Sequence, residues 1–156
     1  MIEIRHRSSG RSFLSVDADT LERANLAGEY LIHADLAHAN LRGAQLLFAN
    51  LSGADMRGAD LAGANLRGAV LIETDLNGAD LAGAILSGAT LSLTILAGCP
   101  SLHRAVGIDK VRHQGPSMLD RVTLSAGGGV LPDSFLRGAG FTGGEIAAIR
   151  AESASE

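Results

Sequence analysis

Leucine recurs at every fifth position from Leu21 to Leu96, with Met56 as the single exception. Five residues of an α-helix rotate a side chain by roughly 140°, and five residues of a strand turn it to the opposite face. Neither element could therefore gather these leucines on one surface. The pattern predicts a chain that turns a corner in every repeat, with the leucines facing a common interior.

The positions around each leucine support the same interpretation. Among sixteen repeats, the residue two before the leucine is alanine in twelve, and the residue two after it is glycine in ten. Asp or Asn directly precedes the leucine in nine. Residues two apart in an extended segment share a face, so alanine and leucine point inward while Asp and Asn point outward. Glycine marks the corner, because it tolerates the backbone angles of a tight turn.

The repeat Ala-Asp/Asn-Leu-x-Gly resembles that of the pentapeptide-repeat proteins. It is written here as AHANLRGAQL, GADMRGADLAGANLRGAVL and NGADLAGAILSGATL, within residues 19–98. The resemblance implies an all-β solenoid, a right-handed quadrilateral β-helix with twenty residues per coil and about four coils. The first coil departs from the pattern, because Asp19 and Glu29 occupy inward positions, and we expect it to be distorted or shielded.

The ends of the solenoid are predicted to be capped, since an open end would expose the core. Residues 1–18 read as an N-terminal hairpin cap, with strands over 2–7 and 12–16 around the turn at 8–11. Residues 19–98 form the β-helix, and the repeat phase fails at Cys99-Pro100.

Residues 99–156 form a small, mainly helical capping or adaptor module. One predicted helix spans 132–137, and a second follows Thr142, whose spacing from Glu145 is that of a capping box. Between them and the repeats, Gly127 to Gly129 are expected to form a loop.

Part of this module has a resemblance of its own. The segments IDKVRHQGPS and LPDSFLRGAGF, within residues 108–141, are similar to a connecting segment after the repeats in some bacterial pentapeptide-repeat proteins, where a TIR-type signalling domain follows. No TIR domain follows in these 156 residues. The resemblance implies an adaptor or a reduced relative of those proteins, and no TIR chemistry.

Composition narrows the function classes. Net charge is −4 and aromatic content is 3% with no tryptophan, so a base-stacking nucleic-acid platform is disfavoured. No apolar run approaches the ~18 residues of a membrane span, and the first residues lack the apolar core of a secretory signal. Cys99 is the only cysteine, which excludes an internal disulfide. We expect a cytoplasmic bacterial protein with no membrane association and no direct nucleic-acid binding.

No set of residues indicates an enzyme. Residues 138–143 satisfy G-x-G-x-x-G, but they lack the βαβ unit of a dinucleotide site, and a turn between helices is the better interpretation. The five histidines are scattered without metal-ligand spacing. We expect no catalytic, cofactor-binding or metal-binding residue.

Two outward features are candidate interaction sites. In a four-sided coil, Asp35, Asp55 and Asp75 form one acidic ladder, and Asp60 and Asp80 form part of another, with Arg57 placed to offset the repulsion. Family resemblance suggests mimicry of DNA toward a type II topoisomerase (gyrase), which would modulate quinolone sensitivity. The repeats carry nine acidic residues and four arginines, an excess of five. That is less than half the charge density of a duplex, so mimicry is the alternative hypothesis.

The second feature is a cluster of outward apolar residues on the third side of the coils and the corner before it. This candidate docking patch comprises Tyr30, Ile32, Leu47, Phe48, Val70, Ile72 and Leu93. It favours a non-enzymatic scaffold or adaptor that binds an unidentified protein, with a homodimer as one form of this. The sequence leaves open whether the C-terminal module itself covers the patch, packs elsewhere on the solenoid, or binds another protein.

Overall fold

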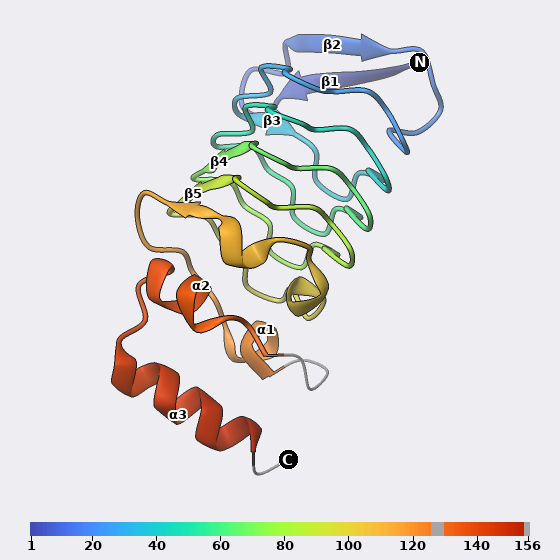
Figure 1. The fold of residues 1–156 in the computed structure, drawn as a ribbon. Coiled ribbons are helices and arrows are strands. Elements are labelled where there is room, and N and C mark those ends of the chain that lie inside the picture. The colour runs from blue at the N-terminus through green and yellow to red at the C-terminus, as the bar shows by residue number, and fades with distance from the viewer. Residues whose placement is uncertain (126–129, 155–156) are drawn as a thin grey trace.

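A computed structural model describes residues 1–125 and 130–154. The expected loop at Gly127 to Gly129 lies outside these residues. The centre of the molecule is a stack of coils, with a hairpin at one end and the C-terminal helices at the other (Figure 1). Parallel bridges join residues twenty positions apart, from Asn25 with Gln45 to Asp75 with Ile95. Four pentapeptides therefore complete one coil, as the repeat predicts.

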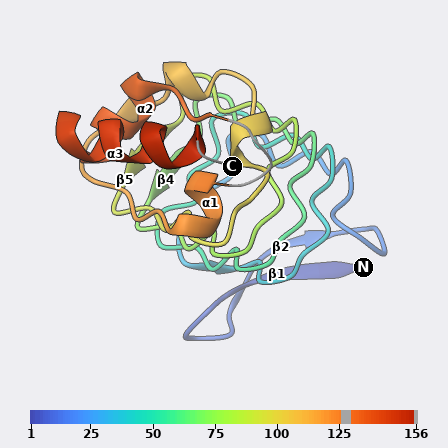
Figure 2. The same ribbon diagram turned by 90° about the horizontal axis from the view of Figure 1, so that it is seen from below.

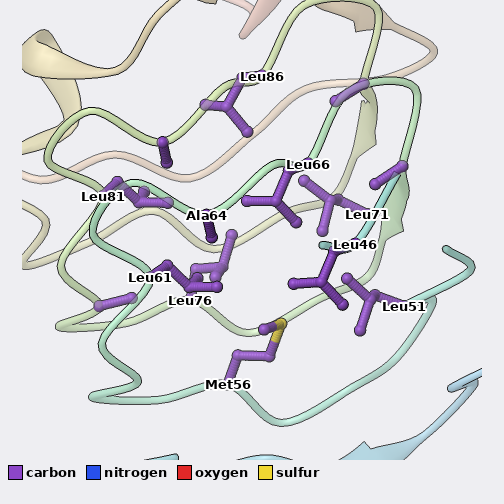
Figure 3. Close-up of a cluster of buried hydrophobic side chains, with 14 of the residues drawn as sticks. Leu46, Leu51, Met56, Leu61, Ala64, Leu66, Leu71, Leu76, Leu81 and Leu86 are labelled. Atoms are coloured by element: carbon purple, nitrogen blue, oxygen red, sulfur yellow. The ribbon is translucent and has the colours of Figure 1, made fainter. Parts of the chain in front are cut away.

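The interior consists of leucine and alanine. Every leucine of the five-residue repeat is buried, and Met56 replaces one of them without interrupting the core. Side chains from successive coils pack on one another inside the solenoid (Figure 3). Burial of each leucine contributes roughly 1.5–3 kcal/mol, so the stack is held mainly by its apolar interior.

Backbone hydrogen bonds connect each coil to the next. The Leu26 N–H donates to the Gln45 carbonyl at 2.8 Å, and the Gln45 N–H donates to the Ala24 carbonyl at 2.9 Å. On the third and fourth coils this pairing between coils extends over three residues and forms two parallel strands, β4 (Val70–Ile72) and β5 (Thr90–Ser92). The turns after β4 and β5 carry Thr at the inward alanine position, and each buried hydroxyl donates to a carbonyl of the preceding coil.

Every corner of the repeat has a left-handed backbone, whether or not it is glycine. The ten repeat glycines have φ between 61° and 72°, and six other residues, among them His33 and Phe48, have φ between 50° and 58° at equivalent positions. His33 lies over Gly53 and Phe48 lies over Gly68, each one coil later. At these two positions a glycine makes room for the side chain of the preceding corner, whereas Glu73 is followed one coil later by Leu93.

The N-terminal hairpin forms as predicted. Strand β1 (Ile2–His6) pairs antiparallel with β2 (Ser12–Val16), and β1 also pairs antiparallel with β3 (Ala34–Asp35) of the first coil. The sheet order is β2-β1-β3, so the hairpin extends the edge of the solenoid. Ile4 is buried in the common core. Asp19, at an inward alanine position of the repeat, is instead exposed, so the chain avoids burying this carboxylate.

Coil pairing continues past Gly98, which the five-residue period does not predict. Val106 pairs with Ile85, β6 (Arg112–His113) pairs with β5, and Met118 pairs with Ile95. The offset between partners rises from 20 residues to 21, 22 and 23 along this turn. Two short 3₁₀ helices take up extra residues, η1 (Leu102–Arg104) and η2 (Ile108–Lys110).

Three helices close the C-terminal end (Figure 2): α1 (Arg121–Ser125), α2 (Asp133–Gly138) and α3 (Gly143–Ser153). Apolar residues of α2 and α3 join the solenoid core, including Phe135 and Ile146. Thr142 and Glu145 form the predicted capping box, and α2 lies one residue later than predicted. The predicted G-x-G-x-x-G segment runs from the end of α2 into α3, as a turn between helices.

Candidate functional site

The third side of the solenoid is the face formed by the residues directly before and after Leu31, Leu51, Leu71 and Leu91. Its outward residues within the repeats carry no charge: Tyr30, Ile32, Asn50, Ser52, Val70, Ile72, Thr90 and Ser92. The corners at either edge of this side supply Phe48 and Leu93. The structure therefore places four residues of the predicted patch on this side and Phe48 and Leu93 at its edges, whereas Leu47, directly after Leu46, lies on the second side.

Several of these side chains are strongly exposed. The exposed fraction is 75% for Tyr30, 64% for Phe48 and 54% for Leu93. Ile32 is 37% exposed, whereas Leu47, Val70 and Ile72 are half-buried. The three helices lie at the end of the solenoid and not on this side (Figure 1). The alternative in which the C-terminal module covers the patch is therefore wrong.

Asn50 and Ser52 separate the apolar residues of the first coil from those of the third. The Asn50 side-chain oxygen accepts a hydrogen bond from the Ser52 hydroxyl at 2.7 Å and another from the Ser52 N–H at 3.1 Å. These polar groups already satisfy one another in part. A protein covering this side would lose less hydration free energy there than over unpaired polar groups.

The fourth side, around Leu36, Met56, Leu76 and Leu96, carries the first acidic ladder. Parallel backbone β-bridges pair Asp35 with Asp55 and Asp55 with Asp75, so the three carboxylates lie in one column. Arg57 donates to Asp55 through Nε at 2.8 Å and Nη2 at 2.5 Å, and its Nε lies 3.9 Å from the Asp75 carboxylate. The hydrogen bond from Arg57 holds the pKa of Asp55 below its ordinary value. Arg57 therefore offsets the repulsion along this column, in the position that the sequence indicates.

The second acidic ladder lies on the first side, the face around Leu61 and Leu81. There a parallel backbone β-bridge pairs Asp60 with Asp80. Arg42 approaches Asp60 at 3.1 Å. Hydrogen bonds from the Ala82 N–H and the Ser101 hydroxyl lower the pKa of Asp80. Both ladders are thus partly neutralised or bound to their own backbone.

Two features of the C-terminal part have no signal in the five-residue pattern. A groove of about 540 Å³ lies between α1 and α3, lined by Leu124, Phe141 and Ile149, with Arg121 and Glu152 paired at 3.1 Å. His113 of β6 packs edge-on against Phe135 at a ring distance of 5.1 Å. Neither ring nitrogen of His113 has a hydrogen-bond partner among the described residues, and burial lowers its pKa. The chain after Gly98 makes a fifth, irregular turn of the solenoid, and this turn places His113 beneath α2.

The described residues offer no group of three or more His, Cys, Asp or Glu side chains that could hold a metal ion. Cys99 is buried, and burial raises the pKa of its thiol to about 11, which disfavours a reactive thiolate. None of the helices in residues 1–125 and 130–154 is long and apolar enough to cross a membrane.

Solved structures of pentapeptide repeat proteins resemble this chain. One from the thylakoid lumen of Arabidopsis thaliana is 32% identical over 56% of this chain and 59% of its own, with a TM-score of 0.32. Another from Nostoc PCC 7120 is 31% identical over 76% and 79% of the two chains, with a TM-score of 0.37. A plasmid-mediated fluoroquinolone resistance protein is 22% identical over 59% and 43%, with a TM-score of 0.32. The match thus spans less than two thirds of the Arabidopsis and resistance proteins.

No protein of curated function is significantly similar in sequence. The sequence profile of the pentapeptide repeats matches residues 21–58 and 59–98, with eight copies. These two segments make up half of the 156 residues and coincide with the regular coils. The protein therefore belongs to the pentapeptide repeat family.

Proposed function

We propose that this protein is a non-enzymatic interaction scaffold, built on a right-handed, four-sided β-helix, whose third side binds a partner protein. The observation that carries the proposal is the exposure of Tyr30, Phe48 and Leu93 on and beside a side whose outward residues within the repeats carry no charge. Exposed apolar clusters on a soluble domain mark interaction sites more often than chance scatter.

The rigidity of the solenoid supports this role. Each coil is hydrogen-bonded to its neighbours, and the inward leucines and Met56 belong to one buried core. Side chains on the third side are therefore presented at fixed spacing of about 4.8 Å per coil. A rigid surface loses little conformational entropy when it binds, which favours docking of a complementary protein.

Mimicry of DNA toward gyrase is the weaker candidate. A mimic needs a dense, unpaired negative field, because steering depends on that field. Here Arg57 and Arg42 bind carboxylates of the two acidic ladders. The likeness to the fluoroquinolone resistance protein is limited to 22% identity and concerns the fold alone.

The scaffold proposal is tested by affinity capture from extracts of the native cell, using wild-type protein and three lysine variants. Tyr30→Lys and Phe48→Lys place a charge on the patch, while Ala27→Lys places the same charge on the exposed second side. We expect a discrete partner to be retained by wild type and by Ala27→Lys, and lost from both patch variants. Equal retention by all four proteins would assign binding to another surface.

A supercoiling assay decides the gyrase alternative. If the scaffold proposal holds, micromolar protein leaves DNA gyrase activity unchanged and does not rescue the enzyme from a quinolone. Inhibition or rescue that survives the Tyr30→Lys and Phe48→Lys changes would support mimicry through the acidic sides instead.

A further inference from the structure

The outward residues of the third side are matched in chemical type within each coil. Two of them flank every inward leucine, and in the four repeat coils both members of a pair are either apolar or polar. The apolar pairs are Tyr30 with Ile32 and Val70 with Ile72, and the polar pairs are Asn50 with Ser52 and Thr90 with Ser92. Backbone bridges align the pairs along the solenoid. Apolar and polar rows therefore alternate from one coil to the next.

This arrangement makes the third side complementary to itself. A rotation of 180° about an axis parallel to the solenoid exchanges the positions before and after each leucine and keeps every coil at its own level. Tyr30 of one copy then faces Ile32 of the other, and Val70 faces Ile72. The polar rows face polar rows in the same way. Neither copy would cover a polar group with an apolar one, which is the costly mismatch in an isologous interface.

The absence of charge within the repeats favours the same occupant. Each of the other three sides has at least one charged outward residue, such as Asp60, Arg67 and Asp55. A partner that placed charged residues against the third side would bury them without a counter-charge. The repeat coils of a second third side bring no such charge.

One edge of the side also fits a second copy. The corner residue Leu93 is 54% exposed at the edge that follows β5. The same rotation places it beside Gly88 of the other copy, which is the corner at the opposite edge of the same coil. A Cβ at Gly88 would meet nothing within 4 Å, so this corner has room for a neighbouring side chain.

The opposite orientation of the second copy fits less well. A twofold axis across the solenoid would set the first coil against the fifth turn, where Arg112 and Gln114 continue the third side. Ile32 would then face Gln114, and the Glu73 corners of the two copies would face each other and repel. The parallel orientation avoids both contacts.

We propose, on the basis of the proposed binding role of the third side, that its partner is a second copy of this chain, in a parallel face-to-face homodimer. Five turns at ~4.8 Å and a width of ~20 Å give a contact of about 500 Å² on each copy. The total is at the small end of the range for specific interfaces, so a dissociation constant of roughly 100 µM is expected.

Sedimentation equilibrium tests the surface. Wild type should pass from monomer to dimer between about 1 µM and 1 mM. Tyr30→Lys places two lysines against apolar residues of the partner and should weaken the dimer at least tenfold. Ala27→Lys is the matched control, because it adds the same charge on the exposed second side and should associate as wild type does. Circular dichroism should show the same fold for all three proteins.

Cysteine cross-linking tests the orientation, and the native Cys99 is buried and does not interfere. In the parallel dimer, Ile32→Cys should cross-link to its own copy through a bismaleimide that spans about 10 Å, and so should Gln114→Cys. A mixture of the two variants should yield no product that joins position 32 to position 114, since four coils separate these levels by ~19 Å. Ala27→Cys should give no cross-link.

The dimer proposal is overturned if wild type stays monomeric up to ~1 mM, or if Tyr30→Lys and Ala27→Lys weaken association equally. The parallel orientation is overturned if cross-links join position 32 only to position 114. A monomeric wild type that still captures another protein, which Tyr30→Lys fails to retain, would overturn the dimer and leave the scaffold function supported.

Discussion

Replacing Gly68 by alanine should destabilise the protein more than replacing Gly63, although the two backbones are the same. Both glycines have a φ of +68°, and both lie at successive corners of the third coil. A Cβ at Gly63 would meet nothing within 4 Å, whereas a Cβ at Gly68 would lie 2.4 Å from the Phe48 ring. The pair therefore separates the cost of backbone strain from the cost of the inter-coil contact.

The shared term is the cost of a left-handed conformation for alanine, about 1–2 kcal/mol. The additional term comes from Phe48, which must leave its position over Gly68. This side chain is 64% exposed, so about a third of its surface is covered. With ~200 Å² for a whole Phe side chain, roughly 70 Å² would be uncovered, equivalent to at most about 1.8 kcal/mol. Since Gly68 supplies only part of this cover, we expect an additional loss of about 1 kcal/mol.

Urea denaturation followed by far-ultraviolet circular dichroism measures both terms. Because the two sites belong to one coil, local unfolding of the solenoid affects both alike. Gly68→Ala should lose about 1 kcal/mol more than Gly63→Ala in the wild-type background. In a Phe48→Ala background the difference should vanish. Equal losses in the wild-type background, or a difference that persists without Phe48, would refute the steric pairing of corners between coils.

Three further perturbations follow from the same structure. Leu61→Asp places a carboxylate in the buried stack and should abolish the cooperative thermal transition, whereas Ala62→Asp on the outer face should retain it. Thr94→Val removes a buried hydroxyl bond of 2.7 Å and should cost about 1 kcal/mol of unfolding free energy in urea, with the outward Thr90→Val near neutral. Burial lowers the pKa of His113 below 6.5, so the folded state binds fewer protons and stability falls as pH drops through and below 6.5. His113→Phe should flatten this part of a stability profile measured from pH 5 to 8, and an unchanged slope would contradict the assignment.

The regular part of the fold could be predicted from the sequence because one constraint repeats in every unit. Inward leucine and alanine, outward Asp and Asn, and corner glycine all share the five-residue period. The hairpin strands and the capping box of Thr142 and Glu145 were also recognisable, since turn and cap chemistry is local. These features depend on neighbours within a few residues.

The fifth turn could not be predicted, because its partners are set by stacking and not by a local pattern. The number of residues between paired positions grows by one on each successive side, so this turn has no fixed sequence period. The burial of His113 follows from that slippage and was missed for the same reason. Helix α1 has five residues and shows no recognisable helical periodicity.

The candidate site was predictable in placement but not in detail. Four-sided coils place Tyr30 and Val70 on the same side, and the structure agrees. The exposure of the patch depends on where the C-terminal helices pack. Phe48 illustrates the difference, since the five-residue pattern does not show that its ring lies over Gly68 of the next coil.

The pairing of a bulky corner with a glycine one coil later limits how such a chain can change its length during evolution. Loss of residues 61–80 would leave Phe48 over Gly88, another corner glycine, so the shortened stack would meet no new side chain there. Loss of residues 41–60 would instead set His33 over Glu73, where it now lies over a glycine. Twenty-residue duplications and deletions are therefore not equivalent along the solenoid, although the stack already accommodates one pair of bulky corners, Glu73 and Leu93.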